Sequence, residues 1–255
     1  MCFDLTSRPP IAPIAGAAAD AREVVLTAAD GARFRAYAAR ASTPTGAGML
    51  VLPDVRGLHP YYEELALRFA EAGIDAIAID YFGRTAGIAR RDDPNFDFMA
   101  EVRKTKLATL NQDIDAAAAY LRSPEGGSVR TLFSVGFCFG GRLSSLQSAS
   151  PRGMAGIISF YGWPVGTLLA DLPAPVDEAP RFRAPVLALY GGADERIPPE
   201  HIQAFDQALK RAGVQHDSHV YPGAPHSFFD RTYEQHADAS ADAWRRVLEF
   251  IAQHR

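Results

Sequence analysis

Hydrophobic residues along this chain fall into short continuous runs that alternate with longer stretches of helical spacing. Residues 49–52 form an unbroken apolar run, which is typical of a strand buried on both faces of a sheet. Residues 62–72 show apolar positions three and four apart and end at Gly73, so a helix is expected there. The same patterns predict strands at 74–79, 129–135, 156–160, 185–189 and 219–221, and helices at 104–121, 140–149, 198–211 and 237–252. This alternation predicts an α/β fold with a mostly parallel, doubly wound sheet and helices on both of its faces.

The first residues follow a different pattern. Residues 1–20 are rich in proline and alanine and show no clear period, so they are expected to form a loose N-terminal arm. Two short strand-like stretches, 23–27 and 34–38, flank an Asp-Gly pair that is typical of a hairpin turn. The chain length suits one large domain, and we expect a single domain over residues 21–255.

The amino-acid composition of the chain limits the classes of molecule that it is expected to bind. The chain has 255 residues, of which 47% are hydrophobic and 22% are charged, and its formal net charge is −4. A mildly acidic chain of ordinary composition does not favour binding to nucleic acid or to anionic membranes, so small molecules are the expected partners. The apolar run at 11–19 contains Pro13 and Gly16 and is too short to span a bilayer.

Cysteine use indicates the compartment. The two cysteines, Cys2 and Cys138, form neither a disulfide framework nor a zinc-binding pattern, and no metal site is expected. An acidic residue lies near the start of the chain where a signal peptide needs basic ones, and a thiol that must stay reduced suits the cytoplasm. We therefore expect a cytoplasmic protein without a membrane anchor.

The strongest chemical signal is Gly-Phe-Cys-Phe-Gly at 136–140. It follows a predicted strand and opens a predicted helix, which is the pattern of a nucleophile elbow with Cys138 in the place usual for serine. Such a turn holds its central residue in a strained conformation, and only very small residues two positions away avoid a collision with it. The start of the helix also favours a thiolate. Taken alone, the motif fits equally well a buried structural cysteine beside closely packed glycines.

Two later residues decide between these interpretations. Asp194 comes just after the predicted strand at 185–189, and His226 lies in a loop rich in proline and glycine after the strand at 219–221. Each of them alone could be an ordinary turn or loop residue. Nucleophile, acid and base in this chain order, on an alternating α/β pattern, predict a catalytic triad of Cys138, Asp194 and His226.

In this architecture two main-chain amides hold the oxyanion that forms during acyl transfer. One amide comes from the loop after the third strand, and the other from the residue after the nucleophile. The expected donors are therefore the main-chain N–H groups of Val55 and Phe139.

With these residues the chain resembles the dienelactone hydrolase family, whose members are also called carboxymethylenebutenolidases. The resemblance covers residues 22–255 and depends on the cysteine elbow at 136–141, on Gly-Gly-Ala-Asp at 191–194 and on Gly-Ala-Pro-His-Ser-Phe at 223–228. It implies an α/β-hydrolase fold without a separate cap domain. It also implies a cofactor-free and often monomeric enzyme that opens lactones or other carboxylic esters. We expect a monomer or a homodimer.

The substrate-binding residues of the family match less evenly. Its members place a glutamate just before the oxyanion residue, where this chain has Asp54, and an arginine after the fourth strand, which matches Arg84. A second family arginine, four residues after the histidine, is replaced by Asp230, with Arg231 next to it. Arg56 could substitute for that arginine. Surface ion pairs are the alternative role for Arg56 and Arg84.

Aromatic residues near these motifs are candidates for the lining of an apolar substrate pocket. They are Trp163 and Phe228, together with Phe82, Phe96 and Phe98. Ordinary core packing is the alternative role for at least half of them.

The sequence therefore predicts a cysteine-dependent hydrolase that cleaves ester or lactone bonds of a small molecule through a thioester acyl-enzyme. The first alternative is a general carboxylesterase or thioesterase of the same fold. The alternative from another class is a non-catalytic ligand-binding or redox-sensing protein that uses Cys138 as its sensor. Such a protein would have no evident use for Asp194 and His226 in triad order.

Overall fold

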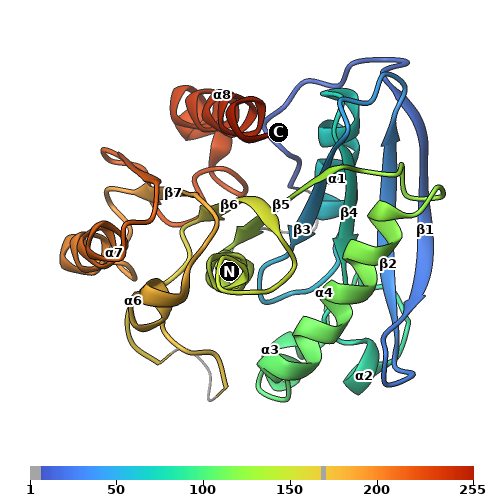
Figure 1. Cartoon of the computed structure of the whole chain (residues 1–255), viewed down its shortest axis with the longest axis horizontal. Coiled ribbons are helices and arrows are strands. Elements are labelled where there is room, and N and C mark those ends of the chain that lie inside the picture. Colours follow the sequence, from blue (N-terminus) through green and yellow to red (C-terminus); the bar gives the residue numbers. More distant parts are fainter. Residues whose placement is uncertain (1–6, 168–170) are drawn as a thin grey trace. The chain divides into compact units, whose positions relative to one another are not determined.

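The computed structural model describes residues 7–167 and 171–255 (Figure 1). By their internal contacts these residues form two compact units. The N-terminal unit comprises Ala12–Leu132 with the segment at 171–172, and the C-terminal unit comprises 133–167 and Pro173–Arg255 with residues 7–11. Residues 1–6 of the predicted arm, including Cys2, lie outside the described residues. The expectation of one domain over 21–255 stays a prediction.

The strands of the N-terminal unit are β1 (Ala18–Thr27), β2 (Arg33–Ala41), β3 (Ala47–Leu52) and β4 (Asp75–Ile79), in the spatial order β1-β2-β4-β3. β1 and β2 pair in antiparallel fashion around Gly31, which has a φ of 84°, so the predicted hairpin is confirmed. β2 is also antiparallel to β4, whereas β3 and β4 are parallel. Because Ala18 already pairs with Ala41, residues 18–20 belong to β1 and not to the predicted arm.

The helices of this unit are α1 (Pro60–Glu71), α2 (Gly83–Ala86), α3 (Phe98–Val102) and α4 (Leu107–Arg122). α1 begins with Pro60, whose restricted backbone suits a first helical position, and the chain turns after it at Gly73, which has a φ of 84°. α4 confirms the helix predicted at 104–121. α2 and α3 are too short to show a helical period in the sequence, which is why the hydrophobic pattern did not predict them.

The C-terminal unit alternates strands with helices. Its strands are β5 (Thr131–Phe137, which enters the unit at Phe133), β6 (Met154–Phe160), β7 (Val186–Gly191) and β8 (His216–Tyr221), in the spatial order β5-β6-β7-β8. Its helices are α5 (Phe139–Gln147), α6 (Pro175–Glu178), α7 (Pro199–Arg211) and α8 (Ala237–His254), with short 3₁₀ turns η1 (Ala179–Arg181) and η2 (Tyr233–His236). β6, β7 and β8 are parallel, so the loops that follow them leave from the same edge of the sheet.

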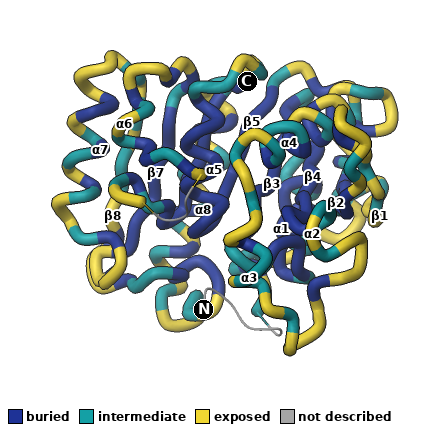
Figure 2. Tube along the Cα trace, turned by 90° about the horizontal axis from the view of Figure 1, so that it is seen from below, coloured by how far each residue is buried: buried dark blue, intermediate teal, exposed yellow. Residues whose placement is uncertain are grey.

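The core of each unit is built on its strands. Every residue of β3, β4 and β7 is buried, as expected for strands covered on both faces. α7 instead buries one stripe and exposes its opposite face (Figure 2). No helix within the described ranges has the length and apolar character needed to cross a membrane.

A buried ion pair organises the loops at the end of β4. Asp80 is fully buried and accepts hydrogen bonds from Nε and Nη2 of Arg91 at 3.1 and 2.7 Å. The same carboxylate accepts the main-chain amides of Leu58 at 3.2 Å and Phe82 at 3.3 Å. Asp80 therefore ties the loop after β3, which carries Val55, to the end of β4.

His59 gives the N-terminal unit a pH-dependent stability. Its side chain is buried, which lowers its pKa from 6.5 to about 4, and the charge of Arg56 adds to this effect. Because the pKa is lower in the folded state, the contribution of His59 to stability is complete above pH 6.5 and is lost as the pH falls toward 4.

We therefore expect the unfolding free energy of the wild-type protein to fall between pH 7 and pH 5. This fall should exceed that of a His59→Gln variant by about 1 to 2 kcal/mol. Urea denaturation of both proteins at the two pH values measures this difference. A difference that is the same at both pH values contradicts a neutral, buried His59.

Candidate active site

Cys138 lies in the sharp turn between β5 and α5. Its backbone has a φ of 57° and a ψ of −113°, a region that residues other than glycine rarely occupy. Hydrogen bonds hold this turn on both sides of the residue. The amide of Cys138 donates to the carbonyl of Phe160 at 3.0 Å, and the carbonyl of Cys138 accepts the amide of Arg142 at 3.1 Å. This is the strained strand-to-helix turn that the Gly-Phe-Cys-Phe-Gly motif predicts.

Glycines make room for the turn. A Cβ atom on Gly136 would lie 1.9 Å from the carbonyl oxygen of Gly140, and a Cβ atom on Gly141 would lie 2.6 Å from the carbonyl oxygen of Phe160. Both oxygens are main-chain atoms, which cannot move aside without opening the turn. The spacing of glycines around Cys138 therefore has a steric cause.

The side chain of Cys138 is 1% exposed and lies at the N-terminal end of α5. The first main-chain amides of a helix have no partner within the helix, and the helix dipole adds a positive potential there. Phe139 is the first residue of α5, so its amide is one of these donors. The position favours negative charge on the sulfur and on an oxyanion that forms beside it.

The acid and the base form a short hydrogen bond in the same unit. Asp194 follows β7 and has a fully buried side chain, and its Oδ2 lies 2.6 Å from Nδ1 of His226. Its other oxygen accepts the amide of Arg196 at 2.9 Å. In the tautomer in which Nδ1 donates its proton to this carboxylate, Nε2 is the basic atom of the imidazole. This is the arrangement that a general base requires.

Main-chain contacts align the loops that carry these two residues. The amide of Ala193 donates to the carbonyl of Ala224 at 2.9 Å, and the amide of Gly192 donates to the carbonyl of Tyr221 at 2.7 Å. A Cβ atom on Gly191 would lie 2.4 Å from the carbonyl oxygen of Ala224. Only glycine at 191 lets the histidine loop pass this close to the end of β7.

Two aromatic rings contact the imidazole of His226. The ring centroid of Trp163 lies 5.1 Å from that of His226, and the centroid of Tyr161 lies 4.8 Å from it. Trp163 is one of the residues predicted to line the site, whereas the sequence analysis did not nominate Tyr161. Its position directly after β6, at the edge where the other functional loops emerge, is the signal that could have identified it.

Phe228 lies in the aromatic core. It is fully buried, and its ring contacts those of Tyr221 at 4.9 Å, Tyr161 at 5.8 Å and Phe160 at 6.3 Å. Asp230, two residues further on, is also fully buried, and its Oδ2 accepts a hydrogen bond of 2.7 Å from the hydroxyl of Tyr161. The position at which the resemblance implies an arginine is thus occupied by a carboxylate that is bonded inside the protein.

Comparison with known proteins identifies the family. Residues 34–255 match the model of the dienelactone hydrolase family. The chain belongs to this family. A "Putative carboxymethylenebutenolidase" of Yersinia pestis is 34% identical to it over 230 residues, which cover 88% of this chain and 85% of that protein. A carboxymethylenebutenolidase of Rhodococcus opacus is 29% identical over 222 residues, which cover 84% of each chain.

A solved structure supports the fold of this dienelactone hydrolase family member. A "Putative Dienelactone Hydrolase" from Klebsiella pneumoniae superposes with a TM-score of 0.80 at 29% identity, over 92% of this chain and 99% of that chain. The expected family and the expected α/β-hydrolase fold with a mostly parallel sheet are therefore confirmed. The expected enzyme class, a hydrolase of carboxylic ester or lactone bonds, is confirmed as well.

The remaining site candidates of this family member lie in its N-terminal unit. Val55 and Arg56 form a turn that closes with a hydrogen bond of 3.2 Å from the amide of Gly57 to the carbonyl of Asp54. The buried carboxylate of Asp54 accepts the amide of Arg56 at 2.8 Å. The guanidinium of Arg56 lies over the ring of Phe98, 5.4 Å from its centroid.

Arg84 is held in an ion-pair network of the same unit. Its Nη2 donates to the buried Asp113 at 2.8 Å and its Nε donates to the same carboxylate at 3.3 Å, while Nη1 pairs with Asp30. Burial raises the pKa of Asp113, an effect that its bonds to Arg84 oppose. Arg84 is thus held by ion pairs within this unit, and its role in substrate binding stays a prediction.

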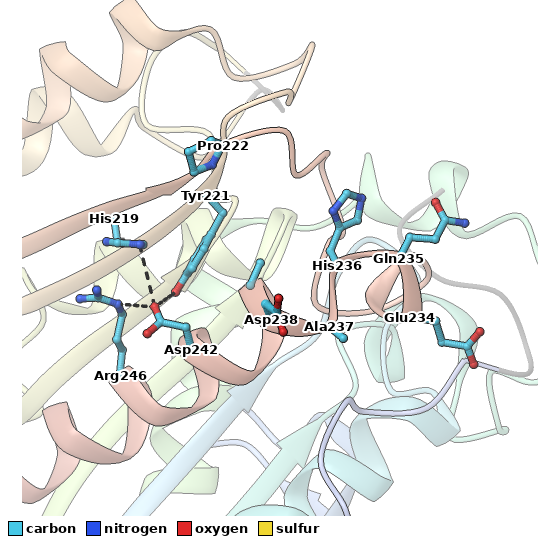
Figure 3. A pocket seen from close by; sticks show the side chains of 11 residues that line it. His219, Tyr221, Pro222, Glu234, Gln235, His236, Ala237, Asp238, Asp242 and Arg246 are labelled. Atoms are coloured by element: carbon cyan, nitrogen blue, oxygen red, sulfur yellow. Dashed lines mark hydrogen bonds and ion pairs between the residues drawn. The ribbon is translucent and has the colours of Figure 1, made fainter.

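The C-terminal unit also has an open groove of about 710 Å³, outside the triad (Figure 3). It is lined by side chains of β8, η2 and the first turns of α8, with none of the triad residues among them. In its wall Asp242 accepts hydrogen bonds from the hydroxyl of Tyr221 at 3.0 Å and from Nε of Arg246 at 2.7 Å (Figure 3). This groove is therefore distinct from the candidate active site.

Proposed function

We propose that this member of the dienelactone hydrolase family cleaves activated esters and enol lactones through a thioester acyl-enzyme on Cys138. One observation carries the proposal. A single compact unit holds Cys138 in a strained turn at the start of a helix and holds His226 bonded to Asp194 at 2.6 Å. These residues are the nucleophile, the base and the acid that the order of motifs along the chain predicts.

In the proposed first step, Nε2 of His226 takes the thiol proton of Cys138, and the thiolate attacks the carbonyl carbon of the substrate. Asp194 keeps the ring proton on Nδ1 and stabilises the imidazolium that forms. The amide of Phe139 donates to the oxyanion of the tetrahedral intermediate. The second proposed donor is the amide of Val55, which is supported by its place in the loop after β3.

The intermediate then collapses. The bond from the carbonyl carbon to the leaving oxygen breaks, His226 gives its proton to that oxygen, and the acyl group stays on sulfur as a thioester. Water that is deprotonated by His226 attacks the thioester carbon, the C–S bond breaks, and the thiolate takes the proton back. For an enol lactone, the leaving oxygen belongs to the acyl group, so hydrolysis gives a single enol acid, which tautomerises to the keto acid.

A cysteine nucleophile limits the range of substrates. A thiolate leaves a tetrahedral intermediate more readily than an alkoxide does, so intermediates from simple alkyl esters return to substrate. Aryl esters and enol lactones have leaving groups that compete with the thiolate. A general carboxylesterase would hydrolyse alkyl esters at least as fast as aryl esters and enol lactones, and a thioesterase would do the same with alkyl thioesters. Initial rates measured with matched substrates of each class distinguish these functions.

The thioester itself can be trapped. We expect wild-type protein that is mixed with p-nitrophenyl acetate and quenched in acid within milliseconds to carry one acetyl group on the peptide that contains Cys138. Neutral hydroxylamine should remove this group, because it cleaves thioesters and leaves ordinary oxygen esters intact. Mass spectrometry of the digested protein with and without hydroxylamine measures both results. An acetyl group that is found only on another residue contradicts the proposed nucleophile.

A further inference from the structure

The imidazole of His226 packs against two aromatic rings, and each of these rings is anchored by a hydrogen bond of its own. Tyr161 and Trp163 both come from the loop after β6, and their ring planes make angles of 53° and 36° with that of His226. The bond from Nδ1 to Asp194 fixes the position of one ring atom, at 2.6 Å. The contacts with Tyr161 and Trp163 limit how far the plane of the ring can tilt. The orientation of Nε2 therefore depends on how firmly Tyr161 and Trp163 are held.

Tyr161 is held at both of its ends. Its backbone has a φ of 39°, and its amide donates to the carbonyl of Leu189 at 2.8 Å. Its hydroxyl donates to Oδ2 of Asp230 at 2.7 Å, and neither residue is exposed to solvent. Removing one partner of a buried hydrogen bond leaves the other without its bond and in an apolar setting, so the pair is costly to break.

Asp230 is in turn held by the segment that follows the catalytic histidine. Its amide donates to the carbonyl of Ser227 at 3.1 Å, and its carboxylate accepts the amide of Arg231. Ser227, directly after His226, has a φ of 68°, so the chain bends sharply at this point. The bond from Tyr161 to Asp230 therefore joins the end of β6 to the bend that places His226.

Trp163 is anchored to the loop of the acid. Its Nε1 donates to the carbonyl of Arg196 at 3.1 Å, and the amide of Arg196 donates to Asp194. The two aromatic residues thus connect His226 to the histidine loop on one side and to the aspartate loop on the other. Both anchors use groups that lie outside the triad.

We propose that the hydrogen bond between Tyr161 and Asp230 sets the plane of the His226 imidazole and so aims Nε2 in the catalytic reaction. Tyr161 and Asp230 are positioning residues, since they act through His226. The proposal rests on the triad function proposed above and extends it to a pair of residues that the order of motifs does not reveal. A displacement of about 1 Å at a reacting group can lower a rate by up to about 100-fold, so a loosened ring has a measurable effect.

The test uses Tyr161→Phe, which keeps the ring, and Asp230→Ala, which removes the acceptor. We expect each to lower kcat with p-nitrophenyl acetate by about 10-fold while KM changes by less than about 2-fold. The double variant should be no slower than the single ones, because both remove the same bond. Asp230→Asn retains an oxygen that can accept the hydroxyl, and it should recover most of the activity.

The chain offers a matched control at Tyr190. Tyr190 is buried at the end of β7, and no described residue forms a hydrogen bond with its hydroxyl. We expect Tyr190→Phe to leave kcat unchanged. Thermal unfolding of every variant, followed by circular dichroism, verifies that it is folded, and Asp230→Asn is the variant to use if Asp230→Ala does not fold.

A second measurement does not depend on turnover. The Cε1–H resonance of His226, identified by its loss in a His226→Gln variant, should change its chemical shift and its titration midpoint in Tyr161→Phe and keep both in Tyr190→Phe. Additive losses of kcat in the double variant, or an unchanged His226 resonance in Tyr161→Phe, overturn the positioning role. If Cys138→Ala is fully active and the His226 resonance is altered in Tyr161→Phe, Cys138 is not the nucleophile. The positioning role of Tyr161 and Asp230 then still stands.

Discussion

Replacing Cys138 with alanine is expected to lower kcat/KM for p-nitrophenyl acetate by at least about 10⁴-fold. Without the sulfur no acyl-enzyme can form, and only direct attack by water remains. The substitution removes one buried atom at the start of α5 and leaves the strained turn, the oxyanion amide and the pair of Asp194 and His226 in place. The loss should therefore fall on kcat, and the unfolding temperature should change little.

The other cysteine of the chain gives the control for this experiment. Cys2 lies outside the described residues, and Cys2→Ala should keep full activity and one thiol that reacts with iodoacetamide. Cys138→Ala should lose the activity and the labelling of the peptide that contains position 138, while the thiol of Cys2 remains. If Cys138→Ala retains more than a few per cent of wild-type activity while Cys2→Ala is also active, the reaction does not use a cysteine nucleophile.

The sequence predicts the fold well where burial alone decides the structure. β3, β4 and β7 are buried along their whole length, so their apolar runs are visible without knowledge of their neighbours. β8 is less buried and begins with His216, Asp217 and Ser218, so only its end was predicted as a strand. Its first half is a strand because it pairs with Val186 to Ala188 of β7, a tertiary contact that leaves no periodic pattern.

In the candidate site, too, the sequence reveals some residues and not others. Cys138, Asp194 and His226 each follow a strand in a fixed chain order, so their motifs can be recognised locally. The bond between Tyr161 and Asp230 joins residues that are 69 positions apart, and no sequence motif indicates that the two residues are partners. Which carboxylate meets which side chain depends on packing, and this is why the sequence left two roles open for Arg84.

Asp194→Asn is expected to lower kcat by about 10³- to 10⁴-fold, with a smaller effect on KM. The carboxylate accepts the Nδ1 proton of His226 at 2.6 Å, whereas an asparagine can present its NH₂ group to that nitrogen. The imidazole then takes the other tautomer, in which Nε2 carries the proton and cannot accept one from Cys138. Loss of the buried charge also leaves the imidazolium of the transition state without its counter-ion.

The neighbouring residue supplies the matched comparison for this substitution. Glu195 is exposed and follows Asp194 directly, so Glu195→Gln removes a carboxylate from the same loop without touching His226. We expect Glu195→Gln to retain wild-type kcat. The kcat of Asp194→Asn should stay low at every pH between 6 and 9, since raising the pH does not move the ring proton of His226 back to Nδ1. An Asp194→Asn protein that recovers more than about one tenth of wild-type kcat at high pH would show that His226 needs only to be deprotonated, and that its orientation by Asp194 is not essential.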